Sequence, residues 1–387
     1  CEVIAGLLRE AGVLESSADP SFRVPGARGG RLETPEEPGL VVYGRSLRTR
    51  EHELWGAVRR GTRRFLFVAA SRTSWAPELG TPEYTAAGLS FALLPLHWES
   101  YALLAKRFAY VAPISLRDRR TTVGMGDRLG IATPGHIRAV RGFDAAPVAA
   151  QQSMRELSLT DRSYRDVVVD AAFGVFQEGY EGGYGADGDH LKTIADIDTA
   201  LDAGMPMITL DLTEVMDPAP AEWSDALVEE RYAGLDDALR SVVEEHYADR
   251  SFDIEGTGVK IPRTDAMRCA LMYGKAMDFT ARVDGHLKKH RGDRYDLEVS
   301  IDETTAPTIP AHHLFIASEL ARRGVAVSSL APRFVGEFQK GIDYIGNTAE
   351  FEKQFALHAG IARSMGGYKV SIHSGSDKFT VYPIIGS

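Results

Sequence analysis

The stretch YGADGDHLKTIADIDTALDAGMPMITLD, residues 184–211, decides the fold class. It begins with a short run typical of a buried strand, Tyr184–His190, and continues with apolar residues at helical spacing over Ile194–Asp202. Gly204 can adopt the left-handed conformation that commonly ends a helix, and Met205–Asp211 is typical of a second strand. This order of strand, helix and strand predicts a parallel βαβ unit.

The same alternation of apolar runs and helical segments continues through the chain after Thr121. Helical patterns such as His312–Arg323 and Thr348–Met365 are each followed by a glycine, which indicates a C-terminal cap. About eight short runs are candidate strands: Thr122–Gly126, Pro147–Gln151, Tyr184–His190, Met205–Asp211, Val259–Ile261, Leu297–Asp302, Val325–Leu330 and Tyr368–His373. This pattern favours a (β/α)8 TIM-type barrel, with a doubly wound open sheet as the alternative.

The N-terminal residues lack this alternation. A stretch rich in glycine, proline and glutamate, residues 25–39, is followed by apolar runs that turn residues separate. We therefore expect an accessory α/β region over residues 1–118 and the catalytic barrel over residues 119–387. A long acidic helical pattern predicts a helical insertion within the barrel at about residues 214–256.

Composition narrows the class of protein. Of the 387 residues, 44% are hydrophobic and 25% are charged, values ordinary for a globular protein. A net charge of −10 gives no basic surface for nucleic acid. Cys1 and Cys269 are too few for a disulfide framework, and the longest apolar stretch, Leu89–Trp98, is too short to cross a membrane. We expect a soluble enzyme in the cytoplasm, without nucleic-acid or membrane partners.

Polar clusters occur where candidate strands end, at residues 126–128, 187–190, 302–304 and 373–378. Because the carboxyl ends of parallel strands meet at one edge of the sheet, these segments can converge on one site. A divalent cation needs several imidazole and carboxylate ligands, and His190, Glu303 and His373 are the candidates. The alternative is that each histidine is an ordinary polar residue on a strand.

Two further carboxylates, Asp189 and Asp302, lie directly beside candidate ligands. Close to a cation, two carboxylates can hold different protonation states, which suits them to acid and base roles. The alternative is that they hydrogen-bond to the ligands and orient them. The sequence leaves open which of Asp302 and Glu303 binds metal and which transfers a proton.

Four basic residues accompany the same strand ends: Arg128, Lys192, Arg333 and Lys378. A guanidinium matches a carboxylate with two parallel hydrogen bonds, so these residues favour an anionic substrate. The alternative is that they only neutralise the acidic edge.

Several long motifs carry a family resemblance: MGDRLGIATPGHIRA, QQSMREL, VFQEGY, GADGDHLKT, SIDET, SLAPRFVGEFQKGIDYIG and SIHSGSDKFTVYPI. In this order they resemble the tagaturonate epimerase family of sugar-acid enzymes, from about Val123 to Ile384. The first 120 residues carry little of it. The chain has Gly188 and His312 where the resemblance leads us to expect alanine and glutamate.

The resemblance implies a metal-dependent (β/α)8-barrel isomerase that interconverts tagaturonate and fructuronate in hexuronate catabolism. It places the family's metal-binding histidine on His190, its acid/base pattern on Asp189, and a further matched motif on His373. The cation is expected to be zinc, manganese, nickel or iron, and the substrate a small ketohexuronate. The sequence indicates no oligomeric state.

Counted from the carbinol end, the two sugar acids differ at C4 and carry their ketone at C2, so the ketone does not acidify the C4 hydrogen. A retro-aldol cleavage followed by re-addition is therefore the expected route to inversion. The alternatives are a metal-dependent ketose isomerase or aldolase acting on a sugar acid and, from another class, a non-catalytic sugar-acid sensor.

Overall fold

The computed structural model describes residues 1–15, 21–24, 30–71, 84–302 and 306–387. Among these residues, no helix combines the length and the apolar character that crossing a membrane requires.

The chain divides into two compact units. The first consists of Cys1–Asp187 with Ala203–Met205, and the second of Gly188–Asp202 with Pro206–Ser387. The division at residue 118 that the sequence pattern suggests, and the helical insertion after it, stay predictions.

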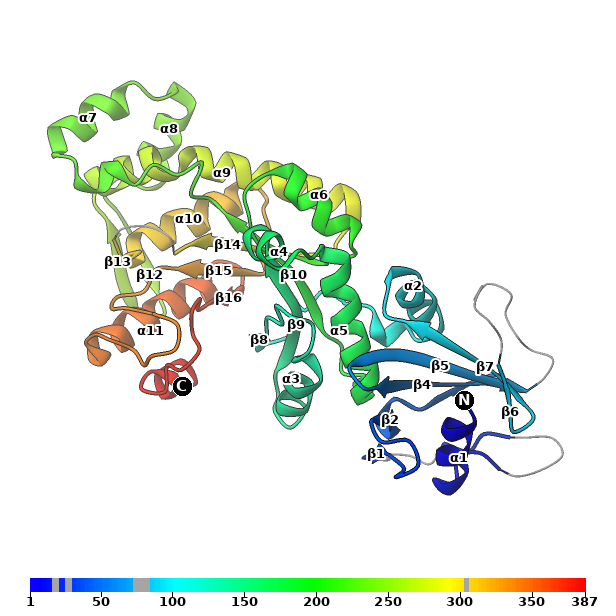
Figure 1. The fold of residues 1–387 in the computed structure, drawn as a ribbon. Coiled ribbons are helices and arrows are strands. Elements are labelled where there is room, and N and C mark those ends of the chain that lie inside the picture. Colours follow the sequence, from blue (N-terminus) through cyan, green and yellow to red (C-terminus); the bar gives the residue numbers. More distant parts are fainter. Residues whose placement is uncertain (16–20, 25–29, 72–83, 303–305) are drawn as a thin grey trace. The chain divides into compact units, whose positions relative to one another are not determined.

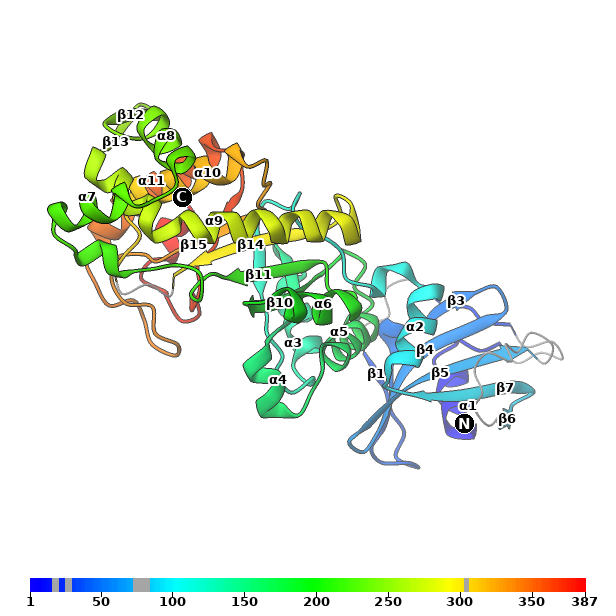
Figure 2. The ribbon, with the colours of Figure 1, turned by 90° about the horizontal axis from the view of Figure 1, so that it is seen from above.

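The N-terminal part of the first unit is an antiparallel sheet covered by a helix. Its strand order is β1-β2-β4-β5-β7-β6, with β3 paired to β4. The strands are β1 (Arg31–Leu32), β2 (Leu40–Tyr43), β3 (Arg48–Arg50), β4 (Glu53–Arg60), β5 (Arg63–Ser71), β6 (Tyr84–Ala86) and β7 (Leu89–Pro95). Helical spacing places Ile4, Leu7 and Leu8 on one face of α1 (Glu2–Glu10), and this face packs into the same core as the sheet (Figure 2).

The remainder of the first unit alternates strands and helices. Its elements are α2 (Trp98–Arg107), β8 (Thr122–Gly124), α3 (Thr133–Val140), β9 (Ala146–Ser153), α4 (Met154–Thr160) and α5 (Tyr164–Glu178), with a short 3-10 turn at Ala109–Val111; another, at Gly44–Ser46, lies between β2 and β3. The strands β8 and β9 are parallel. Both α4 and α5 begin with a capping box, from Ser153 with Glu156 and from Ser163 with Asp166, which satisfies backbone N–H groups of the first turn.

A second sheet has seven strands in the order β16-β15-β14-β11-β10-β9-β8. The further strands are β10 (Gly185–Leu191), β11 (Met207–Asp211), β14 (Asp296–Ile301), β15 (Ser329–Pro332) and β16 (Lys369–Val370). In the second unit β11, β14, β15 and β16 pair in parallel. The fold is therefore mixed α/β with a TIM-like order of parallel strands. An eighth strand, which a full barrel needs, is not among the described strands of this sheet.

The helices of the second unit are α6 (Ile194–Asp202), α7 (Asp225–Ala233), α8 (Asp237–His246), α9 (Arg263–Arg291), α10 (Pro310–Arg322), α11 (Thr348–Ser364) and α12 (Tyr382–Ile385), with a 3-10 turn at Ala219–Glu222. The long helix α9 packs against α7, α8 and α10 (Figure 1). Gly188 leaves room for α6, because a β-carbon there would lie 2.9 Å from the Ala200 Cβ. The glycine thus permits close packing of α6 on β10.

The βαβ pattern is confirmed for the stretch that opens the sequence analysis, since the helix Ile194–Asp202 has the predicted bounds. Most predicted strands differ from the observed ones in their bounds, and two differ more substantially. The Val325 N–H bonds to the Leu320 carbonyl, so Val325 belongs to the end of α10 and β15 begins later. Val259–Ile261 lies in β13 (Thr257–Ile261), which pairs antiparallel with β12 (Arg250–Ile254) in a separate two-stranded sheet.

Candidate metal and active site

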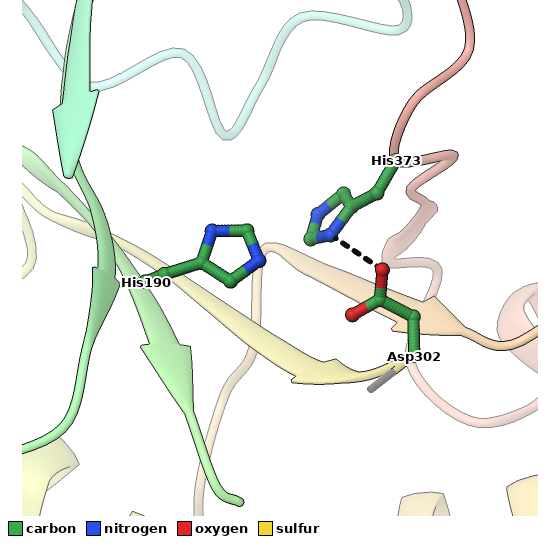
Figure 3. Close-up of side chains that lie close together, drawn as sticks. All are labelled: His190, Asp302 and His373. Carbon is green, nitrogen blue, oxygen red and sulfur yellow. Dashed lines mark hydrogen bonds and ion pairs between the residues drawn. The ribbon is translucent and has the colours of Figure 1, made fainter. Parts of the chain in front are cut away.

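Three side chains from three strand ends of the second unit lie together (Figure 3). His190 lies near the end of β10, Asp302 directly follows β14, and His373 follows β16. One potential ligand atom from each residue lies within 4.8 Å of those of the other two. The structure therefore brings His190 and His373 together, as the sequence pattern predicts.

The two imidazole rings face each other with their centroids 5.0 Å apart. The His373 Nδ1 atom lies 3.1 Å from Asp302 Oδ2, the contact drawn dashed in Figure 3. All three side chains are partly buried, with exposed fractions of 25% for His190, 22% for Asp302 and 18% for His373. The group is thus sheltered but remains open to a small ligand.

Each histidine contacts a carboxylate outside this group of three through one ring nitrogen. His190 Nδ1 lies 2.9 Å from Asp189 Oδ1, and His373 Nε2 lies 2.6 Å from Glu298 Oε1. Metal-binding histidines commonly donate their remaining N–H to a carboxylate, which fixes the ring and raises its basicity. This pattern leaves His190 Nε2 and His373 Nδ1 directed to the shared centre.

Glu298 reaches His373 because side chains along a strand point alternately to its two faces. Glu298, Ser300 and Asp302 are every second residue along β14 and beyond it, so they share one face. Ser300 donates a hydrogen bond to Asp302, and the Ser329 hydroxyl donates one to Glu298. A polar row on an otherwise buried strand is the signal that would have identified Glu298, which the sequence analysis missed.

Apolar packing fixes the segment that carries His373, through the residues that alternate with it along the chain. Val370 and Ile372 pack against an aromatic cluster of the second unit that includes Phe334, Phe351 and Tyr344. The alternate residues Ser371 and His373 hydrogen-bond to Glu298. Apolar packing on one side thus orients the polar residues on the other.

The backbone is strained at His190 and at Ser374, the residue after His373. His190 has φ of +55° and Ser374 has φ of +50°, values that non-glycine residues rarely adopt. Such strain persists only where surrounding contacts enforce it, and it concentrates at functional sites.

The electrostatics of the site couple the two histidines to the carboxylates. Burial alone would lower the pKa of His190, but the hydrogen bond and charge of Asp189 outweigh it and raise the pKa to about 9. For His373, burial is likewise outweighed by Asp302 and Glu298, which raise its pKa to about 11. Burial opposes ionisation of Glu298 and Asp302, yet His373 holds the pKa of both below the ordinary carboxyl value.

This donor set fits a divalent cation. Two imidazole nitrogens and a carboxylate oxygen are ligands that Zn²⁺, Mn²⁺, Ni²⁺ and Fe²⁺ all accept, and three protein ligands leave coordination positions for substrate. A cation replacing the two imidazolium protons would leave the net charge of the cluster unchanged.

Two of the predicted basic residues pair with carboxylates, and the remaining predicted ligand is Glu303. Glu303 lies outside the described residues. Lys192 forms an ion pair with Asp211 at 3.5 Å, and Arg128, in the first unit, forms one with Glu156 at 3.0 Å. Contact of Lys192 or Arg128 with substrate stays a prediction.

Arg333 directly follows β15, the strand between β14 and β16, so it belongs to the same sheet edge as Asp302 and His373. Its backbone exchanges hydrogen bonds with Thr308. Among the described residues no ion pair involves its guanidinium, and contact of this group with substrate stays a prediction.

Lys378 is fully buried. Its ammonium group donates to the backbone carbonyls of Gln339, Ile342 and Ser376 at 2.6, 2.7 and 2.9 Å. These contacts use its three N–H donors and tie two loops together, and direct contact with substrate stays a prediction.

Comparison with known proteins identifies the family. The model of the tagaturonate epimerase family matches residues 43–387. The chain is 38% identical over 352 residues to the tagaturonate/fructuronate epimerase of Thermotoga maritima, covering 90% of this chain and 71% of that relative.

Solved structures agree with this match. The native crystal structure of the fructuronate-tagaturonate epimerase UxaE from Cohnella laeviribosi has a TM-score of 0.85 and 41% identity, covering 91% of this chain and 71% of that one. A crystal structure of the same enzyme with one glycerol has a TM-score of 0.84 and 42% identity, covering 90% and 70%. The resemblance and the enzyme class predicted from the motifs are confirmed. The chain belongs to the tagaturonate epimerase family of isomerases.

Proposed function

We propose that this chain interconverts D-tagaturonate and D-fructuronate by inverting C4, using a divalent cation held by His190, Asp302 and His373. The observation that carries the proposal is the convergence of these side chains from three strand ends in a member of the tagaturonate epimerase family. The sequence leaves both Asp302 and Glu303 as possible ligands, and we propose Asp302.

The surrounding carboxylates support this ligand set. Asp189 and Glu298 each hold the outer nitrogen of one histidine, so both rings present their remaining nitrogen to the same place. When bound, the cation would act as a Lewis acid that polarises the C2 ketone and stabilises negative charge on its oxygen.

A retro-aldol route accounts for the inversion. A carboxylate accepts the proton of the C4 hydroxyl, the C4–O bond becomes a carbonyl, and the electrons of the C3–C4 bond move into the C2 enolate. Rotation of the aldehyde fragment presents its opposite face. Re-addition re-forms the C3–C4 bond, and the proton returns to the oxygen on the inverted C4.

Asp189 is the proposed proton acceptor, because it lies beside the metal ligands without being part of the group of three. Proton transfer by Asp302 is the alternative assignment. Arg333, with its guanidinium unpaired among the described residues, is the proposed partner of the substrate carboxylate, and Arg128, Lys192 and Lys378 are further candidates.

Three broader features complete the proposal. The strands are proposed to belong to a (β/α)8-type barrel, the reaction to serve hexuronate catabolism, and the protein to act in the cytoplasm. The last point rests on the two cysteines of the sequence.

The direct test is incubation of purified protein with tagaturonate and each of Zn²⁺, Mn²⁺, Ni²⁺ and Fe²⁺, with fructuronate detected by chromatography. We expect conversion that EDTA abolishes and fresh metal restores. A His373→Ala variant should remain inactive with metal added, whereas His246→Ala, an exposed histidine on α8, should match the wild type. Absence of conversion with every cation would instead favour an isomerase or aldolase, which product analysis would identify. Conversion that EDTA leaves intact would overturn the metal.

A further inference from the structure

A second group of potential metal ligands lies on helices of the second unit, away from the strand ends. His286 and His290 are one turn apart on α9, with ring centroids 4.5 Å apart. Asp198 on α6 approaches them, and its Oδ1 atom lies 2.5 Å from His286 Nε2. Potential ligand atoms of all three residues lie within 4.8 Å of one another.

We propose that Asp198, His286 and His290 form a second Zn²⁺ site, which links α6 to α9. Histidines at i and i+4 share one face of a helix, so a single ion can bind both. Zinc bonds of about 2.0–2.2 Å to nitrogen and oxygen separate tetrahedral ligands by roughly 3.3–3.5 Å. The potential ligand atoms of the three residues lie within 4.8 Å of one another, and rotation of the side chains would bring them to this spacing.

The exposure of the three residues suits an ion that enters from solvent. The Asp198 side chain is 47% exposed and that of His286 is 22% exposed, while His290 is exposed. Among the described residues the His290 ring makes no hydrogen bond. Its one ring contact there is with His286. Water would complete the coordination shell.

The position of this group in the fold gives the ion a structural role. Helix α6 follows β10, which carries His190, and α9 precedes β14, which leads to Asp302. A cation bound by both helices would therefore tie together the elements next to two strands of the candidate active site. This inference does not depend on the proposed epimerase function.

The test is Zn²⁺ binding to metal-free protein. Equilibrium dialysis measures the affinity, and thermal unfolding measures the stabilisation that the ion provides. The His373→Ala background removes a ligand of the first cluster, so the remaining zinc reports the second. In this background we expect His290→Ala and Asp198→Asn to weaken zinc binding by more than the roughly 10- to 100-fold that loss of an outer-shell partner costs. Lys289→Ala, an exposed neighbour on α9, should bind zinc unchanged.

Zinc should also raise the unfolding temperature of Lys289→Ala but not that of His290→Ala. Equal zinc affinity in His290→Ala and Lys289→Ala would overturn the site. Loss of binding in His290→Ala with full binding in Asp198→Asn would also overturn it as a link between helices, because the α9 histidines alone would then hold the ion. Co²⁺ absorption offers a second readout, since its spectrum should change when either ligand is removed.

Discussion

Glu298 shows how a single buried carboxylate can control the candidate site. Its side chain is 5% exposed, and it accepts a hydrogen bond from His373 Nε2 at 2.6 Å. Replacing it by glutamine keeps the shape but removes the negative charge that would make the imidazole a better donor to the proposed cation.

We predict that Glu298→Gln weakens binding of the active-site cation by about 10- to 100-fold and lowers turnover at limiting metal. Metal titration monitored by activity measures this. Asp296→Asn is the matched control, since Asp296 is buried on the same face of β14 and hydrogen-bonds to Ser328. If both variants lose metal affinity equally, the loss reflects any change of charge on this face of β14. The contact between Glu298 and His373 would then have no specific role.

Asp189 has two possible roles that kinetics can separate. If it accepts the C4 hydroxyl proton, Asp189→Asn should lower kcat by about 10²- to 10⁴-fold while saturating metal still binds. If it only orients His190, to which it lies at 2.9 Å, metal affinity should fall and excess metal should restore turnover. Full turnover of Asp189→Asn without added metal would exclude both roles.

At the scale of elements, Lys378 connects loops that lie next to the site. A buried ammonium that donates to three backbone carbonyls cannot be removed without leaving those carbonyls unpaired. Each unpaired group costs about 1–3 kcal/mol.

We therefore predict that Lys378→Met lowers the free energy of unfolding by several kcal/mol, measured by urea denaturation. Lys340→Met, an exposed change in the same loop, should stay within about 0.5 kcal/mol of the wild type. A Lys378→Met variant of unchanged stability but raised KM would instead assign this lysine to the substrate.

At the scale of the whole molecule, buried histidines couple folding to pH. His313 on α10 hydrogen-bonds to His358 on α11 at 2.8 Å and to the Tyr368 hydroxyl at 2.7 Å. Burial lowers the pKa of His358 from 6.5 to about 4, and burial together with the His358 charge holds the pKa of His313 well below its ordinary value. Both are therefore neutral in the folded protein.

The unfolded chain binds protons at these positions below about pH 6.5, whereas the folded chain protonates His358 only near pH 4 and His313 only well below its ordinary pKa. The free energy of unfolding should accordingly fall as the pH drops from 6.5 towards 4, by about 1.4 kcal/mol per pH unit for each histidine. His358→Gln should make this slope shallower, and His246→Gln should not. Parallel slopes in wild type and His358→Gln, measured by chemical denaturation, would contradict the assignment.

The sequence by itself determined the α/β class, the helix Ile194–Asp202 and the family, because periodicity, glycine caps and long ordered motifs are local properties of the chain. It also predicted that His190 and His373 lie close together, since strand ends in a parallel fold share an edge. It could not find Glu298, because only the folded strand shows that this side chain faces His373. The choice between Asp302 and Glu303 as ligand stays a prediction, since Glu303 lies outside the described residues. Only the tertiary structure could bring Asp198 to His286, because that contact joins positions 88 residues apart.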